Sequence, residues 1–370
     1  MAPLDAISSG SLITREPLSS GPDGIPEVEV DEVDRILYAY ATIDPGLREA
    51  TDSWISRWKT GQSDTFSRYL VRMSRYGSIV EEELVARGLP LSLRYLPLVE
   101  SGYSPVAVSR AGATGLWQLM GPTARELGLT VNSIVDDRND PVASTSAALD
   151  YLETIHEELG SWLLALVAYN VGPGRVRREL ARTESTEPKS RDLRFLEILD
   201  DLPLETREFV PRFLAAAALA GDPGSHGFPE LNLEPMSFDR VEVPGATSLD
   251  VVAEAAEVSE DAVRRLNQQY VRGYTPFGEA RTVRVPAGAG TRFAANLSRI
   301  PLDQRLSFFE HVVSRGETFT HIALQYGLSV SELTATNRLV DPRRLQIGMT
   351  VMVPRAGIAM GNGIRGNSGS

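Results

Sequence analysis

The chain has 370 residues, an apolar content of 42% and a formal net charge of −12. This length allows two or three domains with proper cores, and the apolar content is typical of a soluble globular protein. The negative charge argues against general nucleic-acid binding. The absence of cysteine excludes disulfides and thiolate metal sites, and no run of about 18 apolar residues predicts a transmembrane helix. The histidines show no ligand spacing, so we expect no metal.

The N-terminal region changes character along its length. Residues 1–30 are rich in Ser, Pro, Gly and acidic side chains, which predicts a disordered leader. They lack the basic start and the continuous apolar core of a secretory signal peptide. Residues 31–88 carry apolar residues at helical spacing. Trp54 and Trp58 lie on one predicted helix face, which favours core packing over a sugar-stacking platform.

The stretch at residues 96–120 places one glutamate, Glu100, among apolar residues such as Leu98 and Trp117. Burial raises the pKa of a carboxyl, and a carboxyl that holds a proton near neutral pH can act as a general acid. From composition alone, a cap or an ion pair with an arginine is the commoner role. Pro97 predicts a kink or a late helix start, so Glu100 should lie near the C-terminal end of its helix.

The helices that follow carry clear end signals. Asp140 precedes a proline and an alanine-rich segment, which predicts a helix N-cap. Ser161 caps the next predicted helix, which should stop at Gly172. Tyr169 and Asn170 are therefore expected at a helix end, next to a glycine turn.

Three short blocks carry a family resemblance. They are Glu100-Ser101, then a Gly-Ala and Gly-Leu-Trp-Gln pattern over residues 112–118, then Tyr169-Asn170 after an alanine. In this order and spacing they closely resemble the lytic transglycosylases with a goose-lysozyme-like catalytic domain, and the resemblance runs over roughly residues 80–355. The implied fold class is α+β, mainly α, with a lysozyme-like helical catalytic domain.

The resemblance also implies a reaction. Glu100 would be the catalytic acid and then the base in cleavage of the bond between N-acetylmuramic acid and N-acetylglucosamine, with no metal and no cofactor. The substrate's N-acetyl group would stabilise positive charge, and the muramoyl C6 hydroxyl would attack C1 to leave a 1,6-anhydro end. The substrate-binding residues implied in the same way are Ser101, Gly115, Gln118, Tyr169 and Asn170.

One residue departs from the family pattern. Where the family usually has a tyrosine whose hydroxyl would bind the catalytic glutamate, this chain has Phe209. Phenylalanine has no donor. Either another hydroxyl therefore substitutes, or Glu100 is less restrained and has a higher pKa.

The C-terminal third contains a repeat. Gly and Pro residues over 221–229 mark a break, and the domain boundary is expected near residues 225–235. After it, two segments resemble each other at an offset of about 70 residues. They run over residues 241–286 and 311–354, and each predicts a strand, two helices and a second strand. The first is a degenerate copy with Ala246 in place of a turn glycine, and we expect it to be a structural spacer.

The second segment closely resembles the LysM carbohydrate-binding module, with Glu317 where the module usually has Asp. The resemblance implies binding of glycans that contain N-acetylglucosamine, in a groove between the first strand–helix turn and the second helix–strand loop. The residues that would form this groove are Gly316, Thr318, Phe319, Ile347 and Gly348.

Other functions stay open. A lysozyme-type hydrolase on the same fold would use Asp136, Asp137 or Asp140 to position a water. A non-catalytic wall-binding protein would retain Glu100 without using it. The arginine-rich residues 175–194 are interpreted as a solvated helix face, or as a surface that attracts the peptide carboxylates of peptidoglycan.

The expected partner is therefore the glycan strands of peptidoglycan, with no nucleic acid, and we expect a monomer. Peptidoglycan lies outside the cytoplasmic membrane, so we expect a periplasmic or outer-membrane-associated protein, although no membrane attachment is visible in the sequence. The predicted order is a leader, a transglycosylase domain with an N-terminal helical extension, a degenerate LysM-like unit, a LysM domain and a disordered tail, over residues 1–30, 31–230, 238–300, 309–355 and 356–370.

Overall fold

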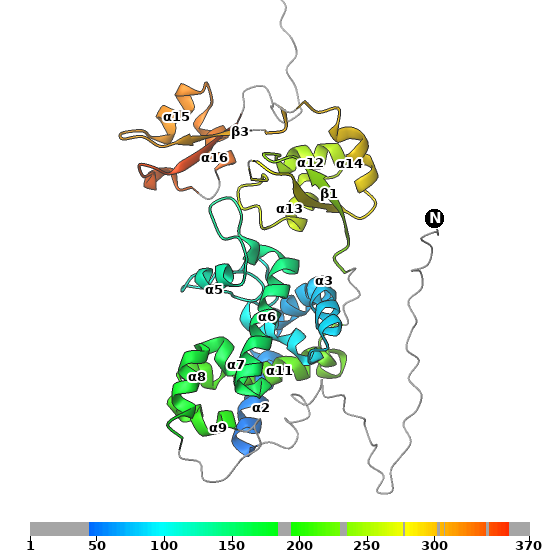
Figure 1. Ribbon diagram of the computed structural model, residues 1–370, viewed down its shortest axis with the longest axis vertical. Coiled ribbons are helices and arrows are strands. Elements are labelled where there is room, and N and C mark those ends of the chain that lie inside the picture. The colour runs from blue at the N-terminus through cyan, green and yellow to red at the C-terminus, as the bar shows by residue number, and fades with distance from the viewer. Residues whose placement is uncertain are drawn as a thin grey trace, which may run out of the picture.

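The computed structural model describes residues 44–183, 194–229, 235–276, 278–301, 304–306, 308–337 and 340–354. The predicted leader and tail lie outside these ranges, as does the start of the helical extension. Within them, a helical part is followed by two small antiparallel sheets, which confirms the α+β, mainly α class (Figure 1). No helix in this described part is both long and apolar enough to cross a membrane.

The helical part begins with two long helices and continues with shorter ones around a buried core. Its α-helices are α2 (Pro45–Thr60), α3 (Ser63–Arg87), α4 (Leu96–Glu100), α5 (Gly121–Glu126), α6 (Pro141–Leu159), α7 (Trp162–Val171), α8 (Pro173–Leu180), α9 (Arg194–Ile198), α10 (Leu204–Arg207) and α11 (Phe209–Gly221). The 3-10 turns between them are η2 (Leu91–Tyr95), η3 (Asp137–Asn139), η5 (Leu199–Asp201) and η6 (Gly224–His226).

The tryptophans of α2 lie against the helical core. Trp58 is buried and stacks on Phe66, with ring centroids 4.8 Å apart, which confirms the expected core packing. Trp54 is only partly buried and donates its indole N–H to Glu208 at 2.6 Å. α2 is therefore attached to the residue that directly precedes α11.

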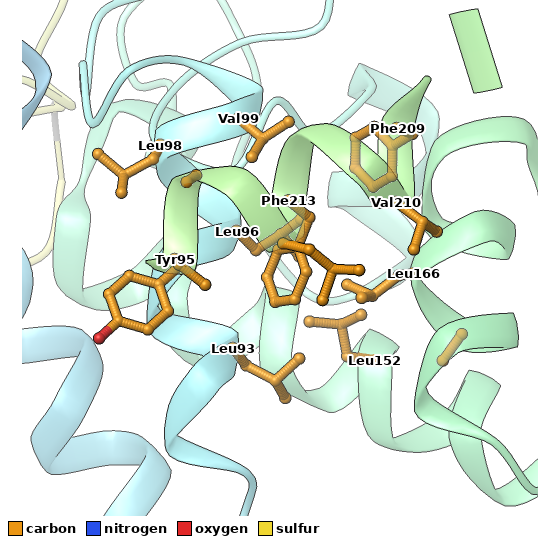
Figure 2. Close-up of a cluster of buried hydrophobic side chains, with 14 of the residues drawn as sticks. Leu93, Tyr95, Leu96, Leu98, Val99, Leu152, Leu166, Phe209, Val210 and Phe213 are labelled. Carbon is orange, nitrogen blue, oxygen red and sulfur yellow. The ribbon is translucent and has the colours of Figure 1, made fainter. Parts of the chain in front are cut away.

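The stretch around Glu100 forms the 3-10 turn η2, which continues directly into α4. Pro97 lies in the first turn of α4, where an N–H would have no intrahelical partner, so the predicted late helix start is confirmed. Glu100 is the last residue of this short helix, also as predicted. Buried side chains of η2 and α4 belong to one apolar cluster with Phe213 of α11 and Leu166 of α7 (Figure 2).

The predicted helix ends are confirmed as well. Asp140 caps α6, since its side chain accepts a hydrogen bond from the backbone N–H of the second helical residue at 2.9 Å. Ser161 caps α7 in the same way, and Gly172 ends it. Tyr169 and Asn170 therefore lie in the last turn of α7.

The C-terminal part contains the predicted repeat, and an additional helix follows the first unit. The first unit comprises β1 (Phe238–Val243), α12 (Leu249–Ala256), α13 (Glu260–Leu266), β2 (Arg281–Pro286) and then α14 (Gly290–Leu297). The second comprises β3 (Phe308–Val312), α15 (Phe319–Gln325), α16 (Val330–Thr336), the turn η8 (Pro342–Arg344) and β4 (Thr350–Pro354). In each unit the two strands pair antiparallel.

The two units also share one buried polar contact. Asn267, just after α13, exchanges hydrogen bonds with the backbone of Arg284 at 2.6 and 2.8 Å. Asn337, just after α16, does the same with the backbone of Met352 at 2.6 and 2.7 Å. Each asparagine thereby ties the end of the second helix to the last strand, which explains why both sequence copies have it at that place.

Candidate active site

Glu100 lies at the C-terminal end of α4 and is partly buried. Burial raises the pKa of Glu100 to about 8, because the charged carboxylate loses hydration; the charge of Arg212 opposes this rise and the charge of Glu205 adds to it. In the described part of the chain, no hydrogen bond reaches the Glu100 carboxyl. A carboxyl in this setting is protonated at neutral pH and can give its proton to a substrate.

Arg212 and Glu205 are charged neighbours of Glu100 that sequence reasoning missed. Arg212 belongs to α11, and its guanidinium lies 5.7 Å from the ring centroid of Phe209 and 5.8 Å from that of Trp54. Burial lowers the pKa of Arg212, and the Glu100 charge opposes that fall. One signal was available, since Arg212 follows Phe209 by three residues and so lies on the same side of the helix.

Phe209, which replaces the family's tyrosine, is fully buried at the start of α11. Its side chain belongs to the apolar core that also holds Val99 and Val210 (Figure 2). Phe209 therefore offers no hydroxyl to Glu100. The polar contribution of α11 to the surroundings of Glu100 is the positive charge of Arg212.

Ser101 connects the end of α4 to the loop that follows. Its hydroxyl donates to the carbonyl oxygen of Leu116 at 2.7 Å and accepts from the backbone N–H of Ser104 at 3.0 Å. The hydroxyl proton is therefore already engaged, and the contact with substrate that the family resemblance implies stays a proposal.

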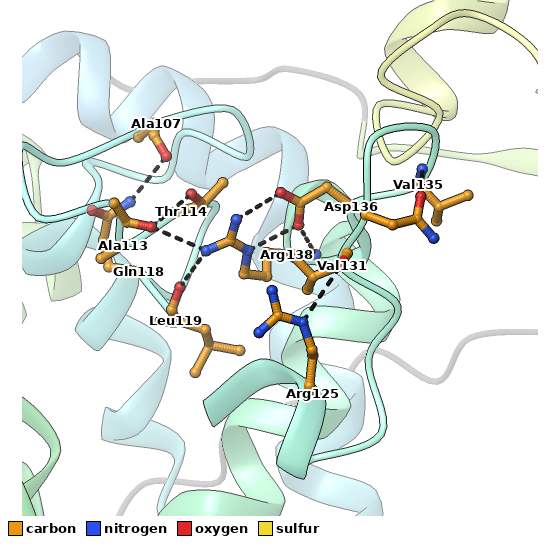
Figure 3. A network of polar contacts seen from close by, with 12 residues as sticks. Ala107, Ala113, Thr114, Gln118, Leu119, Arg125, Val131, Val135, Asp136 and Arg138 are labelled. Atoms are coloured by element: carbon orange, nitrogen blue, oxygen red, sulfur yellow. Dashed lines mark hydrogen bonds and ion pairs between the residues drawn. The ribbon is translucent and has the colours of Figure 1, made fainter. Parts of the chain in front are cut away.

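Gln118 lies in that loop with its backbone in the left-handed region, at a φ of 49°. Its side-chain N–H groups donate to the carbonyl oxygens of Gly115 at 2.9 Å and Ala107 at 3.2 Å (Figure 3). This leaves the amide oxygen as the group that Gln118 can offer to a ligand. A non-glycine residue in this conformation is strained and persists only where its surroundings hold it.

Gly115 is needed for close packing rather than for an exposed contact. It is buried with a φ of 86°, and a Cβ at this position would lie 1.8 Å from the carbonyl oxygen of Arg138. The substrate contact that the resemblance implies at Gly115 would therefore be made by its backbone. Its carbonyl oxygen accepts the hydrogen bond from Gln118.

Tyr169 and Asn170 project from the last turn of α7. The Tyr169 hydroxyl donates to the carbonyl oxygen of Trp117 at 2.7 Å. Burial, with a further contribution from the Glu100 charge, raises the pKa of Tyr169 well above its usual value, so this hydroxyl keeps its proton. The amide oxygen of Asn170 accepts from the Thr206 hydroxyl at 2.8 Å. The proton of the Tyr169 hydroxyl is therefore engaged by a backbone carbonyl and not by the Glu100 carboxyl.

The acidic residues considered for a hydrolase all have structural partners. Asp136 forms an ion pair with Arg138 at 2.7 Å. Asp137 accepts from the backbone N–H of Thr130 at 2.8 Å, and burial raises the pKa of Asp137. Asp140 caps α6, as predicted.

The arginines of α8 and of the turn after it point to a solvated helix face. Arg177 pairs with Glu158 at 3.0 Å, and Arg182 pairs with Glu179 at 2.9 Å while remaining largely exposed. In both pairs the arginine side chain is largely exposed, and ion pairs at the surface contribute little to stability. Residues 184–193 of the arginine-rich stretch lie outside the described residues, and Arg194 after them pairs with Glu197 at 3.7 Å.

The second C-terminal unit brings its two predicted loops together. The backbone N–H of Gly348 donates to the carbonyl oxygen of Val313 at 2.8 Å, and the Thr318 side chain caps α15. Ile347 is 68% exposed beside them. Phe319, in contrast, is 2% exposed and packs in the core of the unit. Its prediction as a glycan contact is wrong for the side chain, because an aromatic residue at a helix start is equally suited to the core.

The turn between the first strand and the first helix of each unit contains a residue that departs from the usual module, Glu317 in the second unit and Ala246 in the first. The Glu317 carboxylate accepts a hydrogen bond from the backbone N–H of Ser314 and contacts His311 at 2.8 Å, and these contacts lower the pKa of Glu317. In the first unit, Ala246 adopts a φ of 61°, a region that favours glycine. The first unit therefore keeps the turn geometry of the repeat without the glycine.

Comparison with known families identifies three domains, in the order that the sequence resemblances predict. Residues 79–191 match the family described as Transglycosylase SLT domain. Residues 237–302 match the LysM-like domain of lytic transglycosylase MltD, and residues 311–354 match the LysM domain.

Individual relatives are similar over parts of their length. The chain is 30% identical to membrane-bound lytic murein transglycosylase D of Escherichia coli K12 over 283 residues, which cover 73% of this chain and 61% of the relative. It is 26% identical to membrane-bound lytic murein transglycosylase F of Stutzerimonas stutzeri, over 51% of this chain and 42% of that protein. A solved structure of an inactive mutant of lytic transglycosylase Slt from Pseudomonas aeruginosa is 29% identical over 40% of this chain and 24% of that one, with a TM-score of 0.33.

Proposed function

Because the chain carries a transglycosylase SLT domain followed by a LysM-like and a LysM domain, we propose that it is a lytic murein transglycosylase. The proposed substrate is peptidoglycan, cleaved between N-acetylmuramic acid and N-acetylglucosamine. The chain spans 61% of the length of membrane-bound lytic murein transglycosylase D of Escherichia coli K12. The proposed activity is therefore argued from the residues of this chain.

The first step of the proposed reaction is proton transfer from Glu100. A pKa of about 8 keeps this carboxyl protonated at neutral pH, so it can protonate the oxygen of the glycosidic bond as that bond breaks. Positive charge develops at C1 of the muramoyl residue. The N-acetyl group of the substrate would stabilise it, since neither Asp136 nor Asp140 is free to act as a second carboxylate.

In the second step, the ionised Glu100 takes the proton from the muramoyl C6 hydroxyl. The hydroxyl oxygen attacks C1 within the same sugar and forms the 1,6-anhydro ring, so no water is consumed. An intramolecular nucleophile already lies close to the reacting carbon, which lowers the entropic barrier. The Glu100 proton is restored at the end of the cycle, because the residue gives one proton and receives one.

Single residues around Glu100 have separate parts in this proposal. The amide oxygen of Gln118 and the amide N–H groups of Asn170 can bind the substrate's N-acetyl and hydroxyl groups. Tyr169 and Ser101 hold the backbone on either side of Trp117 and so fix the wall on which the sugar would lie. Arg212 limits how far the pKa of Glu100 rises.

We also propose that the second C-terminal unit binds glycan strands through Gly316, Thr318, Ile347 and Gly348, and that the protein works in the periplasm or at the outer membrane. The hydrogen bond between Gly348 and Val313, which joins the two loops, supports the first proposal. The names of the membrane-bound relatives support the second.

One observation carries the proposal: Glu100 stands at the end of α4 where burial raises its pKa, while the downstream aspartates have structural partners. The test is product analysis of purified sacculi by mass spectrometry. We expect muropeptides with 1,6-anhydro ends, lighter by one water than hydrolytic products, and none above background with Glu100→Gln. Reducing-end products would contradict the proposal.

A hydrolase is the second candidate, and one observation favours it. Glu205 is exposed and near enough to Glu100 to affect its pKa, so it could hold a water. Glu205→Gln decides this in the same assay. A hydrolase would lose its reducing-end products with this change, whereas the transglycosylase would keep its anhydro products.

A further inference from the structure

A hairpin of the helical domain, residues 131–136, inserts into the first LysM-like unit. Its Val135 is 7% exposed and belongs to the apolar core of that unit, next to Tyr270. The backbone N–H of Asp136 donates to the carbonyl oxygen of Gln269 at 2.9 Å. In Figure 1 a loop rises from the region of α5 toward the unit that contains α12 and α13.

A buried ion pair reinforces this contact between domains. The guanidinium of Arg284, on β2, lies 2.9 Å from the carboxylate of Asp140, and both side chains are almost fully buried. Asp140 at the same time caps α6. Removal of one partner of a buried pair leaves the other charge uncompensated, so separating the two domains at this contact should be costly unless both charges are removed together.

Arg138 continues the contact into the candidate active site. Both oxygens of the Asp136 carboxylate accept hydrogen bonds from its guanidinium, at 2.9 and 2.7 Å. The remaining terminal nitrogen donates to the carbonyl oxygens of Gly112 at 3.0 Å and Leu119 at 3.1 Å (Figure 3). Arg138 therefore holds both ends of the loop that contains Gln118. Its planar guanidinium makes these contacts in a fixed fork geometry that a lysine could not reproduce.

We propose that the first LysM-like unit is a brace for the catalytic loop at residues 112–119. Asp136 is held by the unit through its backbone and holds Arg138 through its side chain. Arg138 in turn fixes the loop in which Gln118 is kept in a strained conformation. Asp136 and Arg138 are positioning residues, and their effect on catalysis rests on the proposed function.

Loosening the brace should affect substrate binding and leave the acid itself unchanged. A looser loop lets Gln118 leave the left-handed region, so kcat/KM should fall about tenfold, mostly through KM. The pH dependence should stay as it is, because neither Asp136 nor Arg138 contributes to the pKa of Glu100. A general loss of folded protein would instead lower kcat alone.

The experiment uses the full chain and hydrogen exchange of backbone amides. Val135→Asp, and the charge-balanced pair Asp140→Asn with Arg284→Met, weaken the interface; asparagine still caps α6. Arg138→Lys weakens the connection to the loop. Arg125→Lys is the matched control, since Arg125 is exposed and, among the described residues, its guanidinium hydrogen-bonds to the Val131 carbonyl at 3.5 Å and to neither the loop nor Asp136.

Particular amides report separate parts of the brace. The Asp136 amide reports the interface, and the Gly115 and Leu119 amides, bonded to Ala107 and Thr114, report the loop. We expect all of them to exchange at least tenfold faster in the interface variants, and only the loop amides to do so in Arg138→Lys. Arg125→Lys should leave all of them unchanged.

Two results would overturn the brace. One is faster exchange at Asp136 with unchanged exchange at Gly115 and Leu119, since the loop would then be held independently. The other is an Asp136 amide that stays protected in both interface variants, since the unit would then not be held by these contacts. Exchange needs no substrate, so it tests the brace even if sacculi give no anhydro products.

Discussion

The hydroxyl of Tyr169 donates a hydrogen bond to the backbone carbonyl oxygen of Trp117, at 2.7 Å. Trp117 directly precedes Gln118, and its own indole N–H donates to Thr145 at 2.9 Å. The last turn of α7 therefore holds the catalytic loop from one side while Arg138 holds it from the other. In the proposed reaction, the tyrosine would therefore affect the substrate through the loop backbone.

Tyr169→Phe should weaken this hold without removing the aromatic ring. The lost hydrogen bond should reduce the free energy of unfolding by about 1 kcal/mol and kcat/KM on soluble glycan by roughly tenfold. Tyr151→Phe is the control, since the Tyr151 ring lies 5.8 Å from that of Tyr169. Equal effects of both substitutions would show that the contact with Trp117 has no special role.

Glu100→Gln should abolish turnover and also stabilise the fold, with a dependence on pH. The folded-state pKa of Glu100 is about 8 against an ordinary value of 4.5, so the unfolded chain gains free energy by ionising as the pH rises between these values. Turnover should fall by at least about a hundredfold. At pH 7 the variant should be more stable, by on the order of 1–3 kcal/mol.

Thermal unfolding at two pH values checks the sign. The gain in melting temperature should be clear at pH 7 to 8 and absent near pH 4, where Glu100 is protonated in both states. A variant that is no more stable at pH 8 than at pH 4 would mean that Glu100 is solvated and ionised in the folded protein.

Much of this fold follows from local sequence signals. Pro97 predicted the start of α4, Asp140 predicted the cap of α6, and the asparagines of the repeat occupy equivalent contacts. These signals act over a few residues, within one helix turn or one strand pair, so a pattern is enough to recognise them.

The partners of the site residues could not be predicted in this way. Tyr169, Ser101 and Gln118 bond to backbone carbonyl oxygens, and every residue has one, so no side-chain pattern indicates which is used. Arg212 reaches Glu100 from a helix more than a hundred residues later in the chain. Phe319 fits a core and a groove equally well by sequence.

The charge of Arg212 and the missing hydroxyl at Phe209 should move the pKa of Glu100 in opposite directions. Arg212→Met removes a positive charge and raises the pKa further; Phe209→Tyr keeps activity and supplies a donor to the carboxylate, which lowers it. In the proposed reaction Glu100 must be protonated to act first, so activity should fall as the pH rises through the pKa of Glu100. The pH at which activity falls on this limb of the pH profile should move up by about half a unit to one unit in Arg212→Met, and it should move down in Phe209→Tyr.

Arg212→Lys, which keeps the charge, is the control for this pair. The pH dependence of kcat/KM on a soluble glycan measures both shifts. An unchanged limb in Phe209→Tyr would count against direct contact between position 209 and the acid. An unchanged limb in Arg212→Met would mean that Arg212 acts only through packing on Trp54.

Gly115 and Gly112 form a matched pair for the close contact with Arg138. Both have φ near 85°, but a Cβ at Gly115 meets the Arg138 carbonyl oxygen at 1.8 Å, whereas a Cβ at Gly112 meets nothing within 4 Å. Gly112→Ala should therefore cost about 1 kcal/mol of stability from backbone strain alone. Gly115→Ala should cost several kcal/mol more and abolish activity, because the loop or Arg138 must move. Denaturant unfolding of both variants measures the difference, and equal losses would contradict the contact.

Ile347 offers a test of glycan binding by the LysM unit. It is 68% exposed beside the loop that Gly348 joins to Val313, so Ile347→Asp should reduce binding to insoluble peptidoglycan at least fivefold with little change in stability. Leu324→Asp is the matched control: Leu324 is 78% exposed on the same unit, near the far end of α15 from Thr318. Both are measured by sedimentation with sacculi, using the full chain with Glu100→Gln so that the wall is not degraded. Equal losses of binding in both variants would indicate general apolar adhesion. A loss of binding confined to Ile347→Asp would place the glycan-binding groove between the two loops.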